Sequence, residues 1–116
     1  MLTLGLTGRI WVCVQPQDGR KSFDGLQAVV WDHLARDPLS GDLYVFRNRR
    51  GDRLKILAWQ GDGFALYLRR LERGTFAFPT ADTAEMSITA TELAMILSGI
   101  ELGSARRPRY ERPPAG

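Results

Sequence analysis

The sequence predicts an α+β fold: a single domain in which an antiparallel sheet of four to five strands, arranged as a meander, carries two helices. Residues 43–78 alternate apolar runs with Gly and Asp punctuation, which is typical of consecutive hairpins. Two other segments, 22–36 and 89–100, repeat apolar residues at helical spacing. The chain has 116 residues, of which 44% are hydrophobic and 25% charged, enough for one core.

The first elements are a strand and a helix. Residues 9–14 form an apolar run that we expect to add a strand at the edge of the sheet. Ser22 offers an N-cap for the first helix, and Asp24 complements the dipole of its first turn. Helical spacing continues to residue 36, and Asp37-Pro38 ends the helix because the residue before proline is pushed out of the α region.

The central region predicts strands at 43–48, 53–60 and 64–71, with a short fourth strand at 75–78. A tight turn at Arg50-Gly51 places Val45 opposite Ile56. A three-residue loop, Gly61-Asp62-Gly63, would place Ile56 opposite Leu68.

This register gives the sheet two different faces, which a slip of one residue would exchange. The first face is apolar and is expected to be core: Leu43, Val45, Leu54, Ile56, Ala58, Leu66 and Leu68. The second face mixes rings with cations: Tyr44, Phe46, Arg53, Lys55, Leu57, Trp59, Tyr67 and Arg69.

The last helix begins at a capping box, Thr89-Ala-Thr-Glu92, and ends at Gly99 or Gly103. Its apolar residues, Leu93, Ile96, Leu97 and Ile100, should pack on the face that carries Ile56 and Leu68. The domain is therefore expected to span 1–103. Residues 104–116 are rich in Pro and Arg and are expected to form a basic, disordered tail.

Several classes of protein do not fit this chain. It has no apolar run long enough for a membrane span and no signal-like N-terminus, and its single Cys13 cannot form an internal disulfide, so we expect a cytoplasmic protein. His33 stands alone, and most aspartates fall at turns or helix starts, where they have local roles. We expect no catalytic residue, no metal site and no cofactor.

Clustered cations point instead to an anionic partner. The net charge is +3, and arginine concentrates in the central strands and the tail. Guanidinium groups bind phosphates and carboxylates through paired donors. The candidate nucleic-acid-binding residues are Arg47, Arg49, Arg50, Arg53, Lys55, Arg69, Arg70 and Arg73.

Rings near these cations could stack on bases, as in sheets that bind single strands. The candidates are Tyr44, Trp59 and Tyr67. The alternative is that the helices cover this face and bury the rings. The Arg49-Arg50-Gly51-Asp52 loop projects from a hairpin tip under either arrangement.

Four segments resemble one known family in the same order. Residues 20–26, RKSFDGL, resemble its RKGFDGL, and residues 37–46, DPLSGDLYVF, resemble DPFSGHLFVF. Residues 49–55, RRGDRLK, are similar to RRGDRIK, and residues 70–74 read RLERG in both. The family is that of the TnpB accessory proteins of IS66-type bacterial insertion sequences. Here Ser22 replaces a usual glycine, and only Trp59 remains of a usual tryptophan pair.

The resemblance implies a transposition accessory protein that works beside a separate transposase, to which the family's catalytic chemistry is assigned. We therefore expect a non-enzymatic module that binds DNA, at the ends of the insertion sequence, through the basic hairpin. The alternative is a protein–protein adaptor that docks on the partner transposase or on the other accessory protein. The sequence leaves the oligomeric state open.

Overall fold

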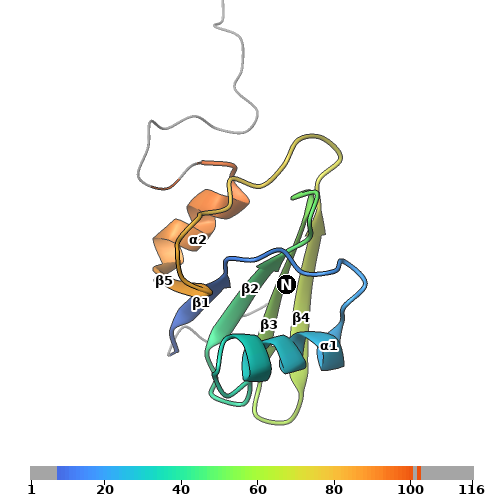
Figure 1. Cartoon of the computed structure of the whole chain (residues 1–116), viewed down its shortest axis with the longest axis vertical. Coiled ribbons are helices and arrows are strands. Elements are labelled where there is room, and N and C mark those ends of the chain that lie inside the picture. The colour runs from blue at the N-terminus through green and yellow to red at the C-terminus, as the bar shows by residue number, and fades with distance from the viewer. Residues whose placement is uncertain (1–7, 101, 103–116) are drawn as a thin grey trace, which may run out of the picture.

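The computed structural model describes residues 8–100 and 102, and it forms one α+β domain (Figure 1). The tail at 104–116 lies outside the described residues. The sheet has five strands in the order β4-β3-β2-β1-β5. Their bounds are β1 Ile10–Cys13, β2 Leu43–Arg47, β3 Arg53–Trp59, β4 Phe64–Arg70 and β5 Glu85–Ile88. The helical elements are α1 Phe23–Ala28, a π-helical turn η1 Val29–His33, and α2 Ala90–Leu97.

The sheet is mostly antiparallel, with one parallel pair. Strand β1 runs parallel to β2 and antiparallel to β5, so it lies inside the sheet rather than at its edge as expected. All four β1 residues are buried, which explains its continuous apolar run. The prediction of a strand at 75–78 is wrong. These residues form no strand, and the fifth strand of the sheet is β5. Residues 75–78 instead place the buried Phe76 and the half-buried Phe78 against the core.

The two helical regions cover opposite faces of the sheet, and Figure 1 shows α1 crossing in front of β2 to β4. Leu93 and Ile96 of α2 pack on the first face with Val45 and Ile56. On the second face, α1 and η1 pack against the strands through residues that share one helical side: Leu26, Val29, Val30 and Leu34. Two cores of unequal size therefore sandwich one sheet.

The predicted register is confirmed between β2 and β3, where Val45 pairs with Ile56. It is wrong by one residue between β3 and β4, where Ile56 pairs with Tyr67. The loop is shorter than expected: the Gln60 amide donates to the Gly63 carbonyl at 2.8 Å, and Gly61 has the positive φ of 93°. A two-residue turn with glycine first accounts for both observations. The slip moves Tyr67 to the first face and Leu66 and Leu68 to the second.

The helix ends also differ from expectation in part. The Thr89–Glu92 capping box is present, with both reciprocal hydrogen bonds. Ser22 precedes α1 but makes no side-chain cap bond. The first helix ends at His33 rather than residue 36, because the Leu34 amide bonds the Val29 carbonyl and Ala35 turns to a φ of 54°. No helix in residues 8–100 has the length and apolar character needed to cross a membrane.

Candidate functional site

The β2–β3 hairpin is built around one side chain, Asn48. Its Oδ1 accepts hydrogen bonds from the Gly51 and Arg53 amides, both at 3.0 Å, and its Nδ2 donates to Asp52 at 2.7 Å. Gly51 supports the turn with a φ of 79°. The Phe76 amide then donates to the Gly51 carbonyl at 2.8 Å, so the tip is held against the rest of the fold. The hairpin is therefore a fixed frame for Arg49, Arg50 and Arg53.

A second loop, residues 17–21, lies beside this hairpin. The Gln17 amide donates to the Arg47 carbonyl at 2.9 Å. The Lys55 ammonium, from β3, donates to the carbonyls of Gly19 and Lys21. Burial, followed by the neighbouring Arg53 charge, lowers the Lys55 pKa. Lys55 thus anchors this loop to the sheet.

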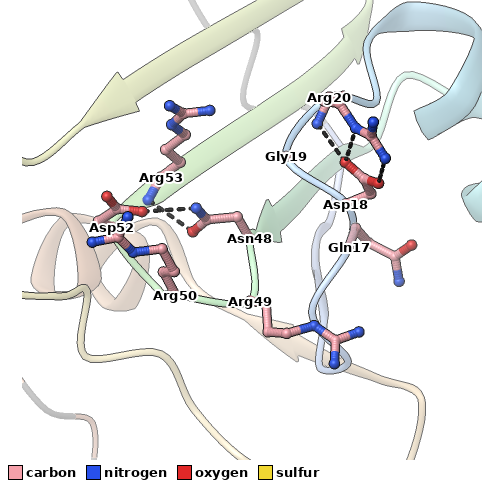
Figure 2. A pocket seen from close by; sticks show the side chains of 9 residues that line it. All are labelled: Gln17, Asp18, Gly19, Arg20, Asn48, Arg49, Arg50, Asp52 and Arg53. Atoms are coloured by element: carbon pink, nitrogen blue, oxygen red, sulfur yellow. Dashed lines mark hydrogen bonds and ion pairs between the residues drawn. The ribbon is translucent and has the colours of Figure 1, made fainter.

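An open hollow of about 370 Å³ separates the two loops (Figure 2). Its lining combines four arginines with two aspartates, for a net charge of +2: Gln17, Asp18, Gly19, Arg20, Asn48, Arg49, Arg50, Asp52 and Arg53. The Arg53 guanidinium passes close to Gly19, where a Cβ would come within 3.6 Å of Nη1. Among the described residues, the guanidiniums of Arg49, Arg50 and Arg53 form no hydrogen bond or ion pair.

The two acids in the hollow are held differently. Asp18 accepts two hydrogen bonds from the Arg20 guanidinium, at 3.1 and 2.8 Å, and one from the Arg20 amide at 2.8 Å. These bonds lower the Asp18 pKa well below its usual range. The hydrogen bond from Asn48, with the charges of Arg50 and Arg53, lowers the pKa of Asp52. Asp18 therefore occupies Arg20, while Asp52 is engaged mainly by a neutral amide.

The other predicted cations lie outside the hollow. Arg47 is half-buried on the first face, where it donates to the Val14 carbonyl at 3.4 Å and lies 5.4 Å from the Phe78 ring. Arg69 donates to the Leu97 carbonyl at the end of α2, at 3.1 Å. Arg70 is exposed and lies 3.8 Å from Glu72, and Arg73 is exposed as well. Arg47 and Lys55 therefore have hydrogen-bond partners within the fold.

The three predicted stacking rings differ in how far they are buried. Tyr44 is 1% exposed, and its hydroxyl donates to the Asp37 carbonyl at 3.1 Å, so its proposed stacking role is wrong. Trp59 is half-buried and meets Phe64 edge-on at 5.0 Å. Tyr67 is half-buried against the first-face core. The alternative of buried rings holds for Tyr44 and for Phe46, which is also 1% exposed.

Six lining residues were missing from the sequence-based site: Gln17, Asp18, Gly19, Arg20, Asn48 and Asp52. An asparagine directly after a strand and before a Gly-containing turn was the one local signal, because Asn bonds nearby backbone amides in turns. Loop 17–21 reaches the hairpin only through tertiary contacts. Within the described residues, no group of three or more His, Cys, Asp or Glu could hold a metal ion.

Comparison with known proteins identifies the family of the chain. A family model described as "IS66 Orf2 like protein" matches residues 8–107. The uncharacterized protein y4jC of Sinorhizobium fredii is 36% identical over 105 residues, covering 90% of each chain. The uncharacterized protein y4hO of the same organism is 38% identical over 101 residues, covering 87% of this chain and 88% of that protein. No solved structure matches significantly. The chain therefore belongs to the IS66 Orf2-like family of transposition accessory proteins.

Proposed function

We propose that this protein is a non-catalytic accessory module that binds the DNA backbone in the hollow between residues 17–20 and 48–53. The observation that carries the proposal is a set of three guanidiniums, those of Arg49, Arg50 and Arg53, that are unpaired among the described residues. They lie on a hairpin that Asn48 holds in place.

Fold stability gives little reason for these charges. Arg49 and Arg50 are exposed, and Arg53 stands directly opposite Arg70 in the sheet. Like charges in facing positions destabilise a strand pair. A bound anion would offset this repulsion, and arginine forks suit phosphate oxygens. Contacts of this kind position a protein on DNA without reading its sequence.

The family supplies the context for this binding. Its members assist transposition, so the ends of the insertion sequence are the DNA we propose. The partner transposase would perform strand cleavage and joining. On this proposal, the protein's own contribution is attachment to DNA and no chemical step.

The test is the triple variant Arg49, Arg50 and Arg53→Ala. We expect an almost unchanged melting temperature, weaker binding to unrelated DNA sequences, and a salt slope flatter by roughly one unit for each lost phosphate contact. Arg9→Ala is the control, because it removes an exposed arginine next to the start of β2, at the opposite end of that strand from the β2–β3 turn. A folded triple variant with unaltered salt dependence would refute the proposal, and an unfolded one would make these arginines structural.

The second candidate is an adaptor for the transposase or for the other accessory protein. It is favoured by the mixed charge of the hollow, where Asp18 and Asp52 could meet basic groups of a protein. Isolation of the partners from cells that carry the whole insertion sequence separates the two functions. Partners that nuclease treatment removes support DNA binding, whereas partners that survive it support the adaptor.

A further inference from the structure

Strand β4 forms one edge of the sheet, and within residues 8–100 no strand lies beyond it. Two hydrogen bonds reveal which of its residues face β3: Gln60 N to Gly63 O, and Leu71 N to Asp52 O, both at 2.8 Å. In an antiparallel pair such bonded positions recur at every second residue. The opposite set therefore directs its amides and carbonyls outward: Phe64, Leu66, Leu68 and Arg70.

Among the described residues, this edge lacks most of the features that usually prevent pairing with another chain. It contains no proline, its seven positions pair with β3 without interruption, and its centre, Leu66-Tyr67-Leu68, carries no charge. Leu68, in the middle of this uncharged stretch, is 56% exposed, which leaves a large apolar side chain in contact with solvent. The only charges, Arg69 and Arg70, stand at one end of the strand.

We propose that β4 is the interface between two copies of this chain, paired antiparallel about a two-fold axis at Tyr67. The outward groups of Leu66 and Leu68 then bond those of Leu68 and Leu66 in the second copy. Phe64 and Arg70 pair in the same way at both ends. Tyr67 faces Tyr67 of the second copy in a non-bonded pair.

The side chains favour a second copy over an unrelated strand. In an antiparallel pair of β4 strands, the charged end of one copy faces the uncharged end of the other. Each Arg70 stands opposite a Phe64 ring, and each Arg69 stands opposite Ala65, so the like charges are kept at opposite ends. Leu66 covers the exposed Leu68 on the second face. An acidic strand from another protein would match only Arg69 and Arg70 and would leave the uncharged centre unexplained.

The register is tested by a cysteine placed at the axis. The facing Cα atoms of a non-bonded antiparallel pair lie about 4.5 Å apart, within reach of a disulfide. Tyr67→Cys should therefore cross-link two copies on mild oxidation. Arg69→Cys is the matched control, because its sulfur would lie roughly 14 Å from its equivalent, four residues along the strand. Cys13 is 0% exposed and is present in both variants.

The association itself is tested by sedimentation equilibrium without DNA, so its result does not depend on the proposed function. We expect a concentration-dependent dimer, with a dissociation constant at least tenfold higher in Leu68→Lys. Leu39→Lys is the control, since Leu39 is similarly exposed, at 52%, and lies outside β4. A wild-type protein that stays monomeric across the concentration series overturns the proposal. A dimer that Leu68→Lys leaves intact, or that cross-links through Arg69→Cys and not Tyr67→Cys, also overturns it.

Discussion

At the scale of single side chains, Asp18 pairs with one of the four arginines that line the hollow. Its carboxylate holds Arg20 through two side-chain bonds, and Arg20 is otherwise highly exposed. Asp18→Asn removes this negative charge and raises the net charge of the hollow from +2 to +3. DNA binding should tighten by roughly one and a half- to fivefold, the scale of one exposed ion pair.

Asp24→Asn is the matched control, because it removes the same charge from an exposed position in the first turn of α1. Fluorescence anisotropy with one labelled duplex at fixed salt measures both variants. Equal affinities for the two would show that Asp18 does not restrain Arg20. Since the hydrogen bonds from Arg20 lower the pKa of Asp18, the carboxylate remains ionised at neutral pH.

Cys13 gives a prediction for alkaline stability. Burial raises the pKa of its thiol above the ordinary 9.0. The unfolded chain then loses this proton before the folded one, so the free energy of unfolding falls as pH rises above about 9, by up to about 1.4 kcal/mol per pH unit. Cys13→Ala has no thiol, so its stability lacks this dependence on pH. Urea denaturation between about pH 7 and pH 10 should show the stability gap between the two proteins narrowing; a constant gap would contradict the shift.

The residues also show what local sequence can reveal about the site. Arg49, Arg50 and Arg53 were predictable, because a Gly-Asp turn between two apolar runs must project from the sheet. The role of Lys55 was not, because its partners Gly19 and Lys21 are more than thirty residues away. Tyr44 was mistaken for a surface ring because its burial also depends on residues distant in sequence. The helical layer of α1 and η1 buries it, and the alternation of residues along the strand does not reveal that layer.

At the scale of elements, the strongly patterned pieces were predictable and the weakly patterned ones were not. Strands β2, β3 and β4 and the capping box of α2 all carry local signals. β5 reads Glu-Met-Ser-Ile, which is short and half polar, and its pairing with β1 joins residues 10 and 88. The β3–β4 register rested on the choice between two-residue and three-residue turns, for which Gly61-Asp62-Gly63 suits both.

Helix α2 depends on its contact with the first face. Ile96 is 0% exposed in that core, whereas Leu97 is half-buried at its margin. Ile96→Ala should lower the free energy of unfolding by about 2–5 kcal/mol, and Leu97→Ala should cost less. Urea denaturation of both variants measures this order. The reverse order would mean that α2 is rotated about its axis.

At the scale of the whole molecule, pairing through β4 would join two sheets into one of ten strands. The hollow lies on the second face, because Arg53 and Lys55 alternate with the first-face residues Leu54 and Ile56. A two-fold axis perpendicular to the sheet keeps both hollows on that face. From a rise of about 3.4 Å per residue and about 4.8 Å between strands, the two hollows lie roughly 35 Å apart. This is close to one turn of B-DNA.

A dimer of this kind should bind DNA through both hollows when the duplex is long enough. On a duplex of about 20 base pairs, Leu68→Lys should bind at least tenfold more weakly than the wild type, because the second contact is lost. On a duplex of about half a turn, which reaches one hollow, the two proteins should bind alike or the variant slightly better. The added lysine would by itself strengthen DNA binding, as it would in the control Leu39→Lys, so a loss confined to the long duplex isolates the effect of pairing. Equal affinities on the long duplex would separate DNA binding from dimerisation and leave each hollow to act alone.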